Sequence, residues 1–140
     1  MSVEIRVLGP DDAPLFERIA EGVFDHPVQP ALLDEFLNDP RHVLSVAIAD
    51  GVIVGMASGV RYVHPDKPSE FWINEVGVAP AFHRQGLGKR IMAELLAHAR
   101  REGCHEAWVL TDDDNTAARA LYTSAGGDNG SPQRMITFRL

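Results

Sequence analysis

The sequence predicts an α/β fold in a single domain over residues 1–140, with a central mixed β-sheet and about four flanking helices. Three observations lead to this prediction. Strand-like and helix-like patterns follow one another in the order β-α-α-β-β-β-α-β-α-β. One long amphipathic helix connects two apolar strands, and such a unit pairs its strands in parallel through a right-handed crossover. The 140 residues are 45% hydrophobic, which is enough for one core.

The first forty residues are expected to form one strand and two helices. Residues 3–8 alternate apolar and polar side chains, as a half-buried strand does, and Gly9-Pro10 ends the run. Asp11 and Asp12 offer an N-cap for a helix with apolar positions from Leu15 to Val23. A shorter helix over residues 32–37 stops before Pro40.

The middle of the chain is dominated by strands. Residues 43–49 and 52–62 flank Asp50-Gly51, a dipeptide that strongly favours a two-residue hairpin turn. Residues 71–78 form a further strand, which we expect to be the partner of the buried strand at residues 107–110.

The last third of the chain begins with its clearest helix, residues 86–101, whose apolar side chains form one continuous stripe ended by Gly103. Asn115 is positioned to N-cap a final helix. Residues 135–140 are expected to close the sheet as a strand.

Composition narrows the possible functions. Twenty acidic residues against thirteen Lys and Arg give a net charge of -7, which argues against nucleic acid or an anionic membrane as a partner. No apolar run approaches the ~20 residues of a membrane span, and residues 1–6 do not resemble a secretory signal. The single Cys104 fits a reducing compartment, so a cytoplasmic protein is expected. The spacing of the six histidines predicts no metal site.

The most informative segment is the turn from the strand at residues 71–78 into the long helix. Gly86 and Gly88 allow close approach of backbone amides at a helix start, which is where anions bind. Arg84 and Lys89 add positive charge, and His83 is a further donor, so the turn suits a pyrophosphate. The P-loop and dinucleotide-binding patterns are both incomplete here. Tight helix–strand packing is the alternative role for the two glycines.

This pattern resembles the GNAT superfamily of acetyl-CoA-dependent N-acetyltransferases over nearly the whole chain. The resemblance rests on four features in order: the acidic strand at residues 75–78, the turn His83-Arg84-Gln85-Gly86-Leu87-Gly88, the strand at residues 107–110, and Asn115 followed by Tyr122 and Gly126-Gly127. The superfamily has Arg or Gln where this chain has His83.

The resemblance implies a GNAT fold with a splayed sheet that binds acetyl-CoA as cosubstrate and transfers its acetyl group directly in a ternary complex. Glycine inside a strand often marks a bulge or a close backbone approach, which fits pantetheine pairing beside Gly77. The expected cosubstrate-binding residues are Val76, Gly77, Val78, His83, Arg84, Gln85, Gly86, Leu87, Gly88, Lys89 and Asn115.

Two side chains are candidates for catalysis under this resemblance. An amine that is protonated at pH 7 must lose a proton before it attacks, and Glu75 is the candidate base. The alternative is that Glu75 only orients the amine. Tyr122 is the candidate acid that protonates the departing CoA thiolate, and a core role is its alternative. An acyl-CoA-binding regulatory module without catalysis, or a nucleotide-phosphate binder, would need neither side chain.

Within the superfamily the chain is most similar to the small aminoglycoside 3-N-acetyltransferases. The likeness rests on Gly22-Val23-Phe24-Asp25, on residues 62–68, and on Glu75. Asp112, Asp113 and Asp114, together with Asp25 and Glu75, are candidates for an anionic trough that binds a polycationic amine such as an aminoglycoside. The alternatives are a polyamine, a peptide amino terminus, or a merely solvated turn. Antibiotic resistance would not follow even from such activity. Dimers are common among these relatives, and residues 135–140 offer a strand for a homodimer.

Overall fold

Five strands form one mixed sheet whose spatial order follows the chain, β1-β2-β3-β4-β5. The first four pair antiparallel, and β5 joins β4 in parallel. The strands are β1 (Val3–Val7), β2 (His42–Ala49), β3 (Val52–Tyr62), β4 (Glu70–Val78) and β5 (Glu106–Val109). The mixed sheet and the parallel pairing across the long helix are therefore confirmed.

The computed structural model describes residues 2–128 and 130–140, which group into two compact units, Met1–Leu110 and Thr111–Leu140. Each unit is described by itself. The first unit holds the sheet, the 3-10 helices η1 (Pro10–Glu17) and η2 (Pro80–Phe82), and the α-helices α1 (Pro30–Asn38) and α2 (Leu87–Arg101). The second holds α3 (Thr116–Ser124). Among the described residues, none of these helices combines the length and the hydropathy that crossing a bilayer requires.

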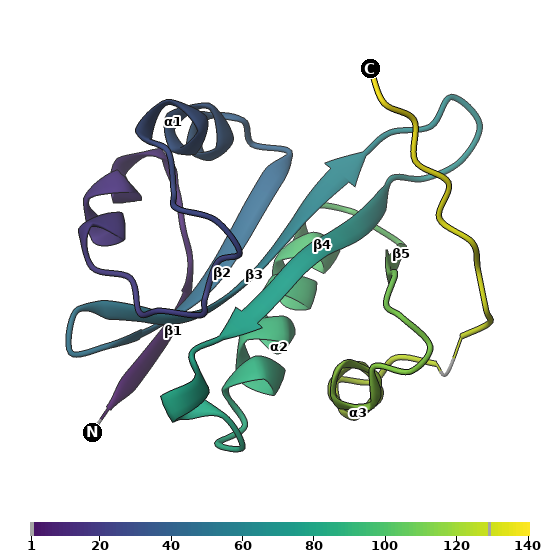
Figure 1. Ribbon diagram of the computed structural model, residues 1–140. Helices are drawn as coiled ribbons and strands as arrows, with labels where there is room; N and C mark the ends of the chain where they lie inside the picture. The colour runs from purple at the N-terminus through teal and green to yellow at the C-terminus, as the bar shows by residue number, and fades with distance from the viewer. Residues whose placement is uncertain (1, 129) are drawn as a thin grey trace. The chain divides into compact units, whose positions relative to one another are not determined.

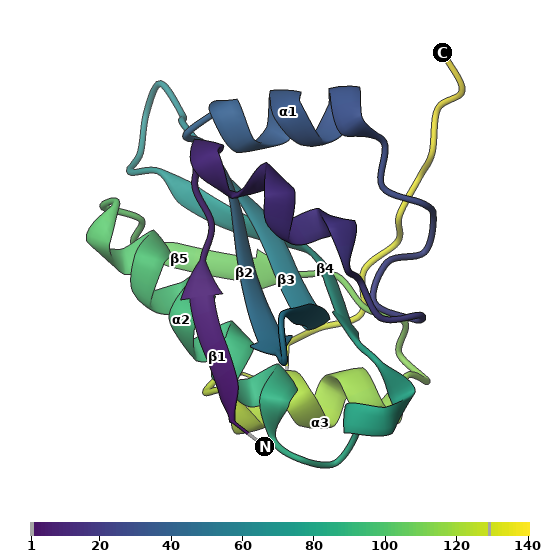
Figure 2. The ribbon, with the colours of Figure 1, turned by 90° about the vertical axis from the view of Figure 1, so that its left-hand side faces the viewer.

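Helices cover both faces of the sheet in the first unit. Helix α2 packs on one face, while η1 and α1 lie on the other (Figures 1 and 2). Two glycines mark the faces. A Cβ at Gly55 would lie 2.8 Å from Ile91 Cδ1 of α2, and a Cβ at Gly77 would lie 2.2 Å from the carbonyl oxygen of Val23. We refer to these as the α2 face and the η1 face.

The helix expected to start at the Asp11-Asp12 N-cap and to carry apolar positions as far as Val23 is wrong beyond Glu17. The structure has the 3-10 helix η1, with Pro14 inside it, and no helix after Glu17 until α1. The backbone beyond η1 pairs instead with β3: the Ile53 amide donates to the Arg18 carbonyl, and the Ala20 amide donates to the Ile53 carbonyl, both at 2.9 Å. These groups are therefore not available for a helical ladder.

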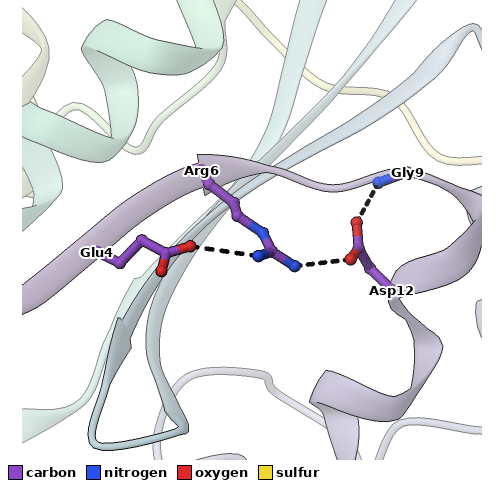
Figure 3. Close-up of polar contacts among 4 residues, drawn as sticks. All are labelled: Glu4, Arg6, Gly9 and Asp12. Carbon is purple, nitrogen blue, oxygen red and sulfur yellow. Dashed lines mark hydrogen bonds and ion pairs between the residues drawn. The ribbon is translucent and has the colours of Figure 1, made fainter.

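The entry into η1 is fixed by Asp12, whose carboxylate accepts two hydrogen bonds (Figure 3). One comes from the Gly9 amide and the other from Arg6 Nη2 of β1, both at 2.7 Å. Arg6 also pairs with Glu4 at 3.3 Å. The aspartate predicted as an N-cap thus ties the turn back to the first strand.

The predicted strand at residues 135–140 is also wrong. These residues have no secondary structure, and the side chains of Met135, Ile136 and Phe138 are 75–79% exposed. Alternating apolar side chains do not suffice for a strand, because its backbone groups need a neighbouring strand. Among the described residues the sheet ends at β5.

Candidate active site

The second edge of β4 is only partly occupied. Strand β5 pairs with residues Glu70 to Ile73 of β4 and no further. Strand β4 continues to Val78, and there it is paired with β3 alone among the strands that the structure describes. On the β5 side the backbone at Val76–Val78 therefore has no strand partner among the described residues, although the Val78 carbonyl accepts a hydrogen bond from His83. Strand β5 ends at Val109, so among the described residues no strand pairs with β4 on this side where pantetheine was expected.

A β-bulge controls the direction of Glu75. Ser58 of β3 pairs with Glu75 and Gly59 pairs with Ile73, so Asn74 is the extra residue in β4. Side chains alternate along a regular strand, so Glu75 would otherwise share the α2 face with buried Ile73. The bulge moves Glu75 to the η1 face, where it is exposed.

Gly77 marks a close approach of the chain's own backbone, while the pantetheine expected beside it stays a prediction. The approaching group is the carbonyl of Val23. Gly22 is also close to Pro80, whose Cδ would lie 2.9 Å from a Cβ added at Gly22. The segment that follows η1 is therefore pressed against the end of β4. Asp25, two residues past Val23, is exposed.

The turn into α2 is held by its own side chains and by unusual backbone angles. The His83 Nε2 donates to the carbonyl oxygen of Val78 at 2.7 Å, which fixes the proton on that nitrogen and leaves Nδ1 for other contacts. Arg84 has φ 62° and Gly86 has φ 76°. A left-handed φ is rare for a residue with a Cβ, so the backbone at Arg84 is strained, as is common at functional sites.

Helix α2 starts with free amides and free charges. Its first backbone bond runs from the Arg90 amide to the Gly86 carbonyl at 3.2 Å, and Gly86 supplies no side-chain cap. The amides of Leu87, Gly88 and Lys89 therefore precede the helical ladder, as in anion-binding helix starts. Leu87 anchors the turn because its side chain is buried.

The two cations of the turn are exposed and are available to a ligand. Arg84 and Lys89 form no ion pair within the described part of the chain. Gln85 donates to the Ala81 carbonyl at 3.3 Å, which braces the loop from within. The charges and amides expected to hold the pyrophosphate are thus brought together by one turn.

The second unit holds the remaining predicted site residues. Asn115 Oδ1 accepts from the Ala118 amide at 3.1 Å, which confirms the N-cap of α3. The side chains of Asp112, Asp113 and Asp114 are exposed. Asp113 lies 3.5 Å from Arg119 Nη1, so this carboxylate is partly neutralised within its own unit.

Tyr122 lies on α3 with its side chain partly buried. Burial raises the pKa of the Tyr122 phenol above its usual value, because the phenolate is the form that loses hydration. The phenol therefore keeps its proton at neutral pH. That is the state a proton donor requires.

One further cluster on the η1 face was not foreseen from the sequence. The rings of Trp72 and Trp108 stack 5.2 Å apart, and Trp72 is 38% exposed. Trp108 Nε1 donates to Tyr62 Oη at 2.8 Å, and Tyr62 donates to Glu70 at 3.1 Å. Both tryptophans sit in apolar runs, so only the register of β4 and β5 reveals the pair.

The comparisons with known proteins assign the family. The model of the acetyltransferase (GNAT) family matches residues 13–126. The chain belongs to this family. It is 38% identical over 104 residues to the N-alpha-acetyltransferase RimI of Mycobacterium tuberculosis, a match that covers 74% of this chain and 63% of that protein. It is 29% identical over 120 residues to a mycothiol acetyltransferase of Saccharopolyspora erythraea, covering 79% of this chain and 38% of that protein.

Solved structures of the same fold include aminoglycoside acetyltransferases. One from an uncultured soil metagenomic sample, in complex with trehalose, matches with a TM-score of 0.81 at 20% identity and covers 99% of this chain and 95% of that one. The aminoglycoside acetyltransferase AAC(6')-Iy, in complex with a CoA-linked bisubstrate analogue, matches with a TM-score of 0.78 at 22% identity over 100% and 99%. These likenesses confirm the GNAT fold.

Proposed function

We propose that this protein transfers the acetyl group of acetyl-CoA to a primary amine of a polycationic small molecule. Our leading candidate for this acceptor is an aminoglycoside that is acetylated at its 3-amino group. The observation that carries the transfer is the open edge of β4 beside Val76–Val78, which leads directly into the amides and unpaired cations of the turn into α2. Family membership and a CoA-linked analogue in a structure of the same fold support it.

The backbone near Gly77 is suited to hold pantetheine, since peptide groups on an open strand edge need partners. The amides of Val76 and Val78 are candidates to hold pantetheine and polarise the thioester carbonyl. The turn amides, with Arg84 and Lys89, suit the pyrophosphate, and Asn115 is a candidate for a pantetheine amide.

The proposed acetyl transfer requires two proton transfers by side chains of this protein. Glu75 takes a proton from the acceptor ammonium, either directly or through water, and the free amine then attacks the thioester carbon. As the carbon–sulfur bond breaks, Tyr122 gives its proton to the CoA thiolate. The exposure of Glu75 and the raised pKa of Tyr122 support these opposite roles.

Charge favours a polycationic acceptor. The net charge of -7 attracts cations. Glu75 is exposed on the η1 face of the first unit, Asp25 is exposed in the same unit, and Asp112, Asp113 and Asp114 are exposed in the second. A structure of this fold, an aminoglycoside acetyltransferase in complex with sisomicin, supports this class. The identity with RimI supports a second candidate, the amino terminus of a peptide.

Release of CoA thiol from acetyl-CoA across one amine panel tests the proposal. The panel holds kanamycin, a gentamicin, spermidine, glucosamine and short peptides with free amino termini. Saturable release with an aminoglycoside supports the leading candidate, and mass spectrometry of the product locates the acetyl group. Release with peptides alone favours the second candidate. Tight binding of acetyl-CoA without any turnover would identify a regulatory acyl-CoA-binding module.

A further inference from the structure

We propose that Trp72 is an acceptor-binding residue, which contacts a second ring of an aminated saccharide whose reacting amine lies at Glu75. This inference rests on the proposed function and adds the subsite that selects the acceptor. The side chains on one face of β4 carry it. Trp72 pairs with Val60 of β3 and Glu75 pairs with Ser58.

The register places both side chains on the same face at a defined spacing. Ser58 and Val60 are two residues apart on β3, so their partners Glu75 and Trp72 point to the same side. Two residues of a strand span about 7 Å. An acceptor that places an amine at Glu75 and extends along β4 by one ring therefore reaches Trp72. A single small ring at Glu75 does not.

Trp72 is held in place from one side. Trp108 stacks on it at 5.2 Å with the ring planes 14° apart. Trp108 is itself fixed by its hydrogen bond to Tyr62, and Tyr62 is fixed by Glu70. Glu70 is in turn bound by Lys67 Nζ at 2.9 Å and lies 3.2 Å from His64 Nε2. This chain of contacts makes the indole of Trp72 a rigid surface that a ligand can use without ordering cost.

The exposed indole indicates the chemistry of the ligand. It offers apolar surface, since 38% of the residue is exposed, and its N–H has no acceptor within the described residues. A saccharide ring offers an apolar C–H surface together with hydroxyl acceptors. A linear polyamine offers no acceptor oxygen. The exposed carboxylates of Glu75 and Glu106, the latter on β5 beside Glu70, favour a ring that carries ammonium groups.

The test compares Trp72→Ala and Trp72→Phe with the unaltered chain on kanamycin, glucosamine and spermidine. We expect Trp72→Ala to raise KM for kanamycin about fivefold or more, with kcat and the KM of acetyl-CoA unchanged, and Trp72→Phe to lie between. Glucosamine and spermidine should show no change. Leu32→Ala, which removes an exposed apolar side chain from α1, is the matched control. Equal changes for all three acceptors, or none for kanamycin, would overturn the proposal.

Intrinsic fluorescence supplies a readout that does not depend on turnover. The chain has two tryptophans, and both belong to this pair. Kanamycin added to the CoA-saturated protein should change the emission with a saturable dose dependence, and Trp72→Ala should raise the fitted Kd about fivefold. If kanamycin binds in this way but no acetyl group moves, the proposed function fails and the Trp72 subsite stands. An emission that saturating kanamycin leaves unchanged overturns the subsite.

Discussion

His83 Nε2 lies 2.7 Å from the carbonyl oxygen of Val78, and this hydrogen bond joins the end of β4 to the turn before α2. It spans the two parts of the expected acetyl-CoA site, the open strand edge and the pyrophosphate turn. Where the superfamily has Arg or Gln, this chain has a side chain that braces the site from inside.

The brace predicts how His83 variants bind the cosubstrate. Because a single hydrogen bond contributes about 1 kcal/mol, His83→Ala should raise the Kd of acetyl-CoA about fivefold. Isothermal titration measures this directly. His83→Gln, which keeps an N–H donor, should recover part of the loss, and His105→Ala, which removes another exposed imidazole, should change nothing. An unaltered Kd in His83→Ala would show that the turn keeps its shape without the brace.

Local sequence patterns predicted the turns and helices that depend mainly on residues close in sequence. The Asp50-Gly51 turn has both residues at positive φ, 50° and 75°, and the stripe of α2 is buried as its spacing required. Gly86 and its neighbours form the expected turn, since glycine spacing and charge there depend on few distant contacts. The turn that we expect to bind the cosubstrate was therefore predictable in its backbone shape.

Distant pairings account for what the sequence did not predict. The segment after η1 is not helical because Arg18 and Ala20 bond to Ile53, more than thirty positions along the chain. The residues around Asn74 give no local indication of a bulge. The bulge is visible only in the pairing register between β4 and β3. The same register brings Trp72 to the face of Glu75. These features depend on the partner strand.

Gly77→Ala is expected to destabilise the first unit. A Cβ there would lie 2.2 Å from the Val23 carbonyl oxygen, and backbone cannot yield as a flexible side chain does. Overpacking of this kind costs about 1–3 kcal/mol of unfolding free energy. Urea denaturation measures it. Gly9→Ala is the matched control, because φ is -126° and its nearest contact would be 3.9 Å away. Equal midpoints for the two variants would argue against the close approach.

Glu70 predicts a pH dependence of stability. The hydrogen bond from Lys67 holds the pKa of the Glu70 carboxyl below its usual value, with a further contribution from Tyr62. Because the pKa of Glu70 is lower in the folded protein than the value of about 4.5 in the unfolded chain, ionised Glu70 stabilises the fold at any pH above 4.5. This contribution is lost as the pH falls from 4.5 through the lower pKa of the folded state. Glu70→Gln should therefore lower Tm at pH 7, and its difference from the unaltered chain should shrink below pH 4.5. Glu106→Gln, on the neighbouring strand, serves as control. A Tm difference that stays constant from pH 7 to 3 would contradict this linkage.

Tyr122→Phe separates proton donation from binding. Because the raised pKa keeps the phenol protonated, removal of its oxygen should lower kcat about 100-fold while the Kd of acetyl-CoA changes less than twofold. The rate of CoA thiol release at saturating substrates gives kcat, and isothermal titration with acetyl-CoA gives Kd. Thr123→Val, which alters an exposed neighbour on α3, should leave both values unchanged. A more acidic thiol leaves more readily as the unprotonated thiolate, so a thioester of such a thiol should be less sensitive to Tyr122→Phe. Equal sensitivity for both thioesters, or full turnover in the variant, would remove Tyr122 as the acid.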